Sequence, residues 1–200
     1  MERETKQQEL DRANWNALRH GDTGAFSSLY NSYSKLLLSY GRKVNGNRQL
    51  VADSVQELFT YLWTRREYLG DTASVRFYLI KSLRTIIIKE NNKSKKVELI
   101  HSENIIDGHN HRENEMINEE NNAERNNLLK KALQMLSKRE QEILYLKYFA
   151  GSTHEEIAEL LDIKYQSVKN VAASGIKKLK EYFGAANANM FISICLLYIM

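Results

Sequence analysis

Residues 152–170 read STHEEIAELLDIKYQSVKN, and this stretch decides the fold of the C-terminal part of the chain. Two overlapping capping boxes, Ser152–Glu155 and Thr153–Glu156, predict that a helix starts here. A three-residue turn at 162–164 separates it from a second helix, predicted over about 165–182. Two helices joined by so short a turn are typical of a helix-turn-helix motif.

The apolar residues of this stretch support that interpretation. Ala158 is small enough to let the second helix cross closely, and Ile163 fills the turn. The other apolar positions recur at helical spacing and are expected in the core: Ile157, Leu161, Val168, Ala172, Ile176 and Leu179. The exposed start of the second helix then carries Tyr165, Gln166, Ser167, Lys169 and Asn170. In this motif such positions enter the major groove of DNA, where Gln and Asn read adenine and Lys reads guanine or holds phosphate. Lys177 and Lys178, further along the helix, suit phosphate contacts.

The sequence on either side of this motif is also helical in pattern. Upstream, the capping box Ser137–Glu140 opens a helix that is predicted to run through 149 and to end at Gly151. Within residues 1–97, apolar side chains recur at intervals of three and four in three segments, around 26–40, 51–63 and 76–89. Proline is absent, so little interrupts these helices. The prediction is an all-α chain.

Charge divides the chain of 200 residues into segments. Residues 1–97 carry a net charge of +7, residues 98–127 carry −6, and the remainder carries +3. The acidic segment has eight Asn and no strand alternation, so it is interpreted as a flexible linker between two small helical domains, 1–97 and 128–184. The single cysteine and a polar N-terminus fit a reducing, intracellular setting.

The helix predicted over 51–66 has a polar side opposite its apolar stripe. At 100° per residue this side gathers Asp53, Gln56, Glu57 and Thr60. An acidic and amide ridge on an otherwise basic domain can meet the arginines of a partner helix. The alternative is an ordinary solvated helix face.

Several motifs resemble the sigma-70 family of bacterial RNA polymerase factors, and in particular its extracytoplasmic function (ECF) group. The run Asp53-x-x-Gln56-Glu57-x-Phe59-x-x-Leu62-Trp63 resembles region 2, and the run from Gly21 to Tyr30 resembles the helix that opens the small sigma factors. The segment Phe77–Arg84 is similar to the promoter-melting segment. The segments Leu136–Leu146 and Glu155–Ala158 resemble region 4. The chain departs from the family pattern at Asp162, where glycine is usual, at Lys164, where a Ser or Thr cap is usual, and at Tyr78, where Trp is typical.

The resemblance implies a sigma factor that binds core RNA polymerase and recognises the upstream (−35) and melts the downstream (−10) promoter elements. The ridge of residues 53–60 would dock on the clamp of the largest polymerase subunit, and the helix-turn-helix would read upstream DNA. Downstream DNA would be held by Arg76, Tyr78, Lys81, Arg84 and Lys89. The loop 67–74 is the candidate pocket for an extruded base, with Phe77 expected in the core and Tyr78 exposed. Neither a cofactor nor a small-molecule substrate is implied, a membrane-associated anti-sigma factor is an additional candidate partner, and the setting would be cytoplasmic.

Two other classes of protein fit the sequence less well. A response-regulator type of transcriptional regulator can carry a similar helix-turn-helix, but it needs an α/β domain upstream that residues 1–97 do not offer. An enzyme is disfavoured, because there is no glycine-rich phosphate loop or nucleophile motif, and His101, His109, His111 and Glu113 lie in a polar segment unsuited to a metal. The apolar tail, within 185–200, fits no family pattern. Its run 190–200 is too short for the roughly 20 residues that span a bilayer, and packing against protein is favoured over an anti-sigma contact or a membrane surface.

Overall fold

The computed structural model describes residues 2–101 and 131–183, and these form helices joined by turns without a strand among them. The prediction of an all-α fold is confirmed. The chain separates into two compact units, 1–110 and 111–200, which are considered separately. Most of the expected linker and all of the apolar tail lie outside the described residues.

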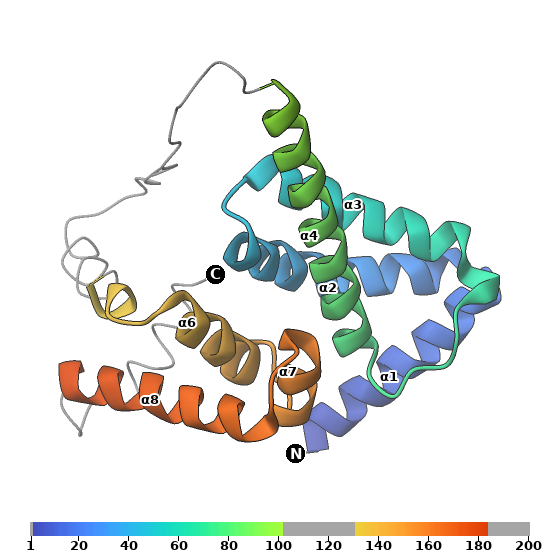
Figure 1. Cartoon of the computed structure of the whole chain (residues 1–200). Helices are drawn as coiled ribbons and strands as arrows, with labels where there is room; N and C mark the ends of the chain where they lie inside the picture. Colours follow the sequence, from blue (N-terminus) through green and yellow to red (C-terminus); the bar gives the residue numbers. More distant parts are fainter. Residues whose placement is uncertain (1, 102–130, 184–200) are drawn as a thin grey trace, which may run out of the picture. The chain divides into compact units, whose positions relative to one another are not determined.

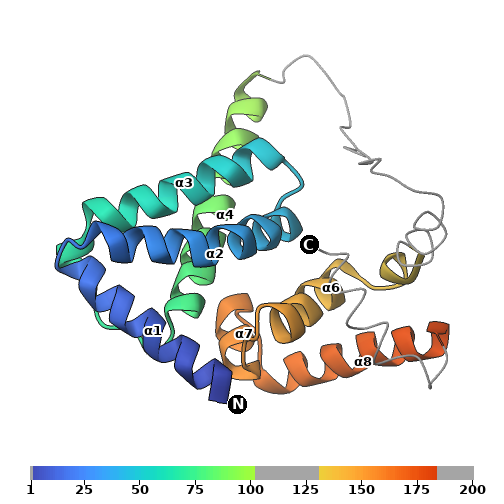
Figure 2. The same ribbon diagram turned by 180° about the vertical axis from the view of Figure 1, so that it is seen from behind.

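The N-terminal unit is a helical bundle (Figures 1 and 2). Helix α2 packs against α1, α3 and α4, and α3 also packs against α4. The elements are α1 (Glu2–Arg19), α2 (Thr23–Val44), α3 (Arg48–Thr64), the 3₁₀ turn η1 (Arg66–Tyr68) and α4 (Val75–His101). Helix α4 thus continues beyond residue 97, where the linker was expected to begin.

Side-chain caps and buried stripes explain why these helices form where they do. Asp22 caps α2 by accepting a hydrogen bond from the Ala25 amide at 2.9 Å, and Asn47 caps α3 in the same way. The stripe predicted for α3 is buried from Val51 to Leu62. It faces a core that also contains Leu29, Leu37, Tyr40, Leu79, Leu83 and Ile87.

Helix α1 was not expected as a separate element. Trp15 and Leu18 are fully buried, and Trp15 Nε1 donates to the Gly70 carbonyl oxygen at 3.0 Å. Asp11 is buried as well, and it accepts hydrogen bonds from the Tyr33 hydroxyl and from Gln7 Nε2. Burial, together with the hydrogen bond to Asp11, raises the pKa of Tyr33, so its hydroxyl remains a donor. These contacts fix α1 to α2 and to the loop before α4.

The C-terminal unit contains the helix-turn-helix. Its elements are α6 (Lys138–Leu144), the π-helical turn η3 (Tyr145–Phe149), α7 (His154–Leu161) and α8 (Tyr165–Phe183), and residues 131–134 are also helical. The helix predicted through 149 therefore changes to π geometry at Tyr145. The capping boxes Ser137–Glu140 and Thr153–Glu156 are both formed.

The second box predicted for α7, Ser152–Glu155, does not form. Ser152 is buried, and its amide donates to the Leu146 carbonyl oxygen at 2.9 Å, so Ser152 belongs to the preceding turn. Thr153 is the cap, and α7 consequently begins at His154.

The turn between α7 and α8 depends on a left-handed residue. Asp162 has φ +50°, the conformation that glycine adopts most easily. The Ile163 amide closes the turn by donating to the Ala158 carbonyl oxygen at 3.0 Å, and Arg139 Nη2 donates to the Leu161 carbonyl oxygen at 3.1 Å. Asp162 therefore adopts the left-handed conformation at the position where the family pattern has glycine.

A buried carboxylate joins α6 to α8. Glu140 accepts hydrogen bonds from Lys178 Nζ at 2.8 Å, from Ser174 Oγ at 2.8 Å and from the Ser137 amide at 2.8 Å. Burial alone would raise the pKa of Glu140, but these hydrogen bonds outweigh it and lower the pKa from 4.5 to about 2. The carboxylate is therefore ionised at neutral pH and links the two helices.

Candidate functional site

The polar ridge of α3 lies on the exposed side of the N-terminal unit. Asp53, Gln56, Glu57 and Thr60 are all exposed, whereas the opposite side of the helix is buried. Gln49 Nε2 donates to Asp53 Oδ1 at 2.9 Å, which orients that carboxylate along the helix. The four residues thus form one continuous acidic and amide surface.

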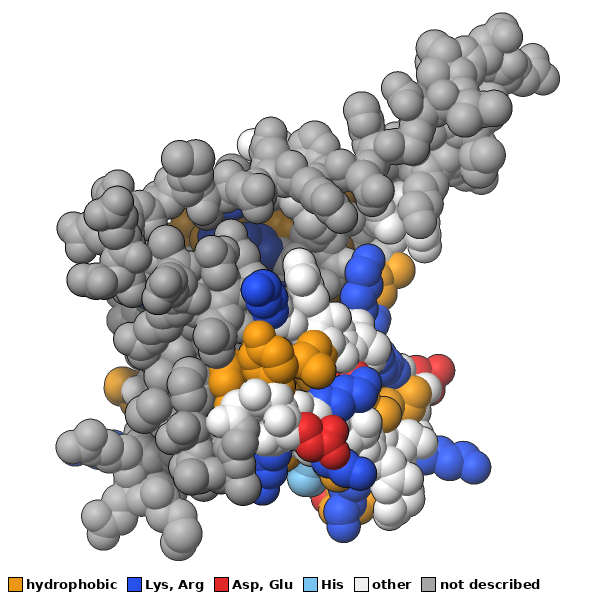
Figure 3. Space-filling view, turned by 90° about the vertical axis from the view of Figure 1, so that its left-hand side faces the viewer, with side chains coloured by type: hydrophobic (Ala, Val, Ile, Leu, Met, Phe, Trp, Pro, Cys, Tyr) orange, Lys and Arg blue, Asp and Glu red, His pale blue; other side chains and the backbone are white. Residues whose placement is uncertain are grey.

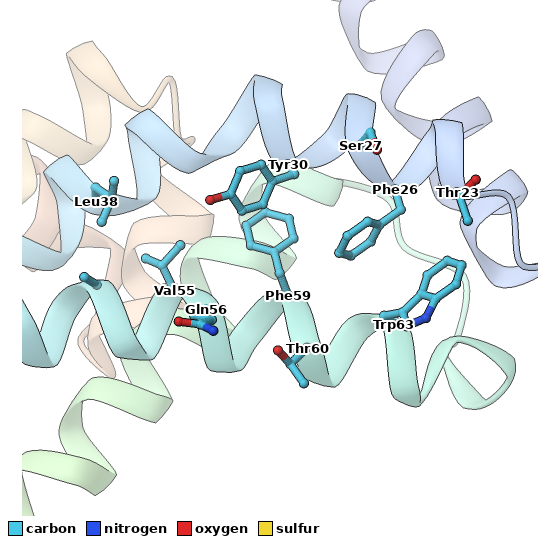
Figure 4. A pocket seen from close by; sticks show the side chains of 11 residues that line it. Thr23, Phe26, Ser27, Tyr30, Leu38, Val55, Gln56, Phe59, Thr60 and Trp63 are labelled. Atoms are coloured by element: carbon cyan, nitrogen blue, oxygen red, sulfur yellow. The ribbon is translucent and has the colours of Figure 1, made fainter.

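An aromatic groove borders this ridge, and sequence analysis missed it. It lies between α2 and α3, has a volume of about 650 Å³, and is shown in Figure 4. Phe59 packs edge-on against Phe26 and Tyr30, with ring centroids 6.0 and 4.8 Å apart. The Trp63 ring lies 5.3 Å from that of Phe26. Gln56 and Thr60 also line the groove, so ridge and groove form one surface.

The residues predicted to hold downstream DNA are arranged around α4. Lys81 and Lys89 are exposed, whereas Arg76, Tyr78 and Arg84 are half-buried. The expectation that Phe77 is core and Tyr78 exposed is wrong. Both are half-buried. The Tyr78 ring is partly covered because it packs edge-on against Trp15, with ring centroids 4.9 Å apart. Burial raises the pKa of Tyr78 as well.

The loop 67–74, predicted as a base pocket, is anchored to the protein core. Leu69 is buried, and the Gly70 carbonyl oxygen accepts a hydrogen bond from Trp15 Nε1. Ser74 Oγ accepts from the Phe77 amide at 3.2 Å and so caps α4. Tyr68 is 80% exposed, and it is the aromatic side chain that this loop presents to solvent.

The residues predicted to read upstream DNA share the first turns of α8. Tyr165, Gln166, Ser167, Lys169 and Asn170 are all exposed. Gln166 Nε2 donates to Asn170 Oδ1 at 3.1 Å, and Lys169 Nζ lies 5.7 Å from the centre of the Tyr165 ring. The Tyr165 ring also contacts His154, whose pKa is lowered by burial and by the nearby Lys147. Among the described residues, which are the coloured ones in Figure 3, Lys and Arg side chains are more prominent than Asp and Glu.

Lys177 and Lys178 differ in their surroundings. Lys177 is exposed and makes a long ion pair with Glu181, at 3.8 Å. Lys178 is bound to the buried Glu140, so its ammonium holds α6 and α8 together. The phosphate contact predicted for Lys178 conflicts with this structural role, and sequence alone could not reveal a partner 38 positions away.

The part of the chain that the structure describes contains no group of three His, Cys, Asp or Glu side chains placed to hold a metal ion. Within the same residues, no helix is both long enough and apolar enough to cross a membrane.

Comparison with known proteins indicates which family the C-terminal unit resembles. Residues 126–179 match the family model of sigma-70 region 4, a span that includes α6, α7 and most of α8. Residues 126–179 of the C-terminal unit therefore resemble sigma-70 region 4, and α7 and α8 form a helix-turn-helix within this span.

The resemblance extends beyond this unit. The chain is 27% identical over 154 residues to the ECF RNA polymerase sigma factor SigL of Mycobacterium tuberculosis, covering 76% of this chain and 85% of the relative. Its fold is similar to CnrH, solved in complex with the cytosolic domain of CnrY, with a TM-score of 0.55, 17% identity, and coverage of 88% of this chain and 98% of CnrH. It is also similar to the sigma factor RpoE of Bartonella quintana, solved with the anti-sigma factor NepR, with a TM-score of 0.57, 17% identity, and coverage of 78% and 95%. These findings confirm the resemblance to ECF sigma factors of the sigma-70 family, which act in transcription initiation.

Proposed function

We propose that the protein binds core RNA polymerase and directs it to promoters, reading the −35 element with α8 and opening the −10 element with α4. The observation that carries this proposal is the exposed polar start of α8 within a region 4 domain. The N-terminal unit supplies the polar ridge of α3 for binding polymerase, and helix α4 with its lysines and arginines for opening the promoter. These steps need binding and strand separation but no catalytic group.

The proposed polymerase surface is the ridge of α3 together with the aromatic groove. Carboxylates such as Asp53 and Glu57 form strong charge-assisted hydrogen bonds with arginines. The adjacent groove offers apolar area that can be desolvated, which the ridge alone lacks. A partner helix with arginines beside an apolar stripe fits both, and the proposed partner is the clamp of the largest polymerase subunit.

The proposed melting surface is formed by α4 and the loop before it. Lys81 and Lys89 are exposed for phosphate contacts, and Arg76 and Arg84 reach solvent in part. Unstacked bases need aromatic platforms. Tyr78 offers one only in part because of its contact with Trp15, and Tyr68 is more accessible.

The proposed upstream reader is the start of α8. Gln166 and Asn170 present amides suited to adenine, and Lys169 presents an ammonium suited to guanine or phosphate. Lys177 remains a candidate for a backbone contact, whereas Lys178 is assigned to the Glu140 network.

An anti-sigma factor is a further proposed partner. The two similar structures were solved with CnrY and with NepR. We extend this to the present chain as a proposal, with the cytoplasm, where polymerase and promoters meet, as its setting.

The response-regulator alternative is not favoured. Such a protein needs an α/β domain upstream of its helix-turn-helix, whereas residues 2–101 contain helices and turns and no strand.

Transcription from a promoter library tests the proposal. Core polymerase with the purified protein is expected to produce transcripts that start at a restricted set of promoters, and core polymerase alone is not. Binding of the protein to core without any promoter-dependent transcript would contradict it.

A further inference from the structure

We propose that residues 190–200 dock on an exposed groove of α8 and so cover part of the surface that faces DNA. This α8 groove has a volume of about 460 Å³ and is lined by Ala173, Ile176, Lys177, Lys180 and Glu181. It is separate from the buried side of the helix, which carries Val168, Ala172, Gly175 and Leu179. Ile176, predicted for the core, is therefore only half-buried and lies in this groove.

The groove and the segment match in chemistry. Ten of the eleven side chains of 190–200 are apolar, and residues 184–200 include no Asp, Glu, Lys or Arg. Ala173 and Ile176 provide an apolar floor, and the carbon stems of Lys177 and Lys180 can extend it while their ammonium groups remain in water. A contiguous apolar run is unfavourable in solvent, so cover by an apolar groove would stabilise it.

The length of the connection suits this groove. Residues 184–189 follow α8 directly, and six residues span at most about 20 Å. The way back along α8 from residue 183 to Ala173 is about 15 Å, because a helix rises 1.5 Å per residue. A short tether also gives the segment an effective concentration in the millimolar range at this groove.

Because of the position of the groove, docking would affect DNA binding by α8. Lys169, Ala173, Ile176 and Lys180 follow one another at intervals of four, three and four residues, so they share one side of α8. A docked segment would therefore lie beside Lys169 and compete with DNA there. This consequence rests on the proposed function, whereas the docking itself does not.

Cross-linking of the full chain tests the docking. Cys195 is the only cysteine, so one added cysteine defines a pair. Ala173→Cys places it in the α8 groove, and the matched control Ala52→Cys places it in the aromatic groove, also at an exposed alanine. With a short bismaleimide, we expect an intramolecular link to residue 173 in at least tenfold higher yield than to residue 52. The variant Leu196→Asp with Leu197→Asp is expected to abolish that link.

Other outcomes identify other occupants and overturn the proposal. Equal yields, or preference for residue 52, would rule out the α8 groove. Dimers linked between chains would indicate a second copy, and loss of the link on adding phosphatidylglycerol vesicles that capture the protein would indicate a membrane surface.

A DNA measurement separates docking from its consequence. The Leu196→Asp/Leu197→Asp variant is expected to bind an upstream promoter duplex at least threefold more tightly than the unaltered chain. Unchanged affinity with an intact cross-link would leave docking in place and overturn the competition. Absence of binding by either protein to any duplex, also with core polymerase present, would count against the proposed function and not against docking.

Discussion

Asp162 carries a conformational cost that glycine would avoid. A left-handed residue with a side chain is disfavoured by roughly 1–2 kcal/mol, although Asp tolerates this region better than most residues. Its φ of +50° closes the turn on which the position of α8 depends. We therefore expect Asp162→Gly to stabilise the C-terminal unit by about 0.5–1 kcal/mol and Asp162→Val to destabilise it. Calorimetric unfolding of the full chain measures both.

Gly151 provides the control for this prediction. It also has a left-handed φ, of +64°, so Gly151→Ala should lower the stability of the same unit. A loss of stability in Asp162→Gly, together with a loss in Gly151→Ala, would show that the Asp162 side chain makes a contribution larger than its backbone strain.

The lowered pKa of Glu140 predicts that the C-terminal unit loses stability in acid. Its folded-state pKa of about 2 lies below the ordinary value of 4.5, so ionised Glu140 stabilises the fold above about pH 5. That stabilisation is lost as the pH falls from about 5 to about 2, because the unfolded chain then binds the proton first. The shift corresponds to about 3 kcal/mol. Urea unfolding between pH 2 and 6 is expected to show this loss for the C-terminal unit.

The variant Glu140→Gln tests the assignment. It should be less stable at pH 7 and should lose most of the dependence on pH between 2 and 5, whereas Glu159→Gln, at an exposed position on α7, should retain it. An unchanged pH dependence in Glu140→Gln would assign the acid sensitivity to another group.

At the scale of elements, α3 carries a prediction about partner binding. Asp53→Ala with Glu57→Ala is expected to weaken binding to core polymerase at least tenfold, because charge-assisted contacts contribute about 1.5–3 kcal/mol each. Both residues are exposed and opposite the buried stripe, so the helix content should not change. Titration by fluorescence anisotropy measures the affinity. Glu9→Ala, exposed on α1, is the control, and equal affinities for all three proteins would remove the ridge from the interface.

We expect the start of α8 to determine which DNA sequences are preferred, and Lys177 further along to strengthen binding to any sequence. Gln166→Ala with Lys169→Ala should change which −35 sequences are used, since good base contacts discriminate by roughly 1–3 kcal/mol. Lys177→Ala should weaken all sequences alike, because a lysine further along the helix reaches only phosphate. A promoter library transcribed by each holoenzyme makes the comparison. The same sequence preference for the unaltered chain and the double variant would mean that α8 is not the reading helix.

Local patterns predicted several of these elements, and long-range contacts account for what was missed. The stripe of α3 and the boxes at Ser137 and Thr153 depend on residues three or four apart, so the sequence displays them directly. Helix α1 was missed because it buries few apolar side chains, with Trp15 and Leu18 the largest.

Tertiary neighbours also decided details that no pattern contains. A Cβ on Gly41 would overlap Val51 Cγ1, so the close approach of α2 to α3 requires glycine there. Phe26 and Trp63 fit an apolar stripe, and only their positions on two different helices reveal a groove. The ion pair of Lys178 with Glu140 also depends on tertiary structure, because the two residues lie on separate helices.

At the scale of the whole molecule, we expect the isolated protein to bind promoters weakly and to open them only with core polymerase. The sequence predicts a flexible connection of about thirty residues between the two units, which has a root-mean-square span of roughly 30 Å with a broad spread. Fixing both units on one rigid partner raises the effective concentration of the second unit at its DNA element without new contacts. The net charge of −6 on residues 98–127 opposes binding of the isolated chain further, because it can occupy basic surfaces that phosphate would otherwise reach. A fluorescence assay of promoter opening with permanganate footprinting, with and without core enzyme at equal salt, measures the difference. Opening by the isolated protein at a comparable concentration would instead favour a regulator that acts without polymerase.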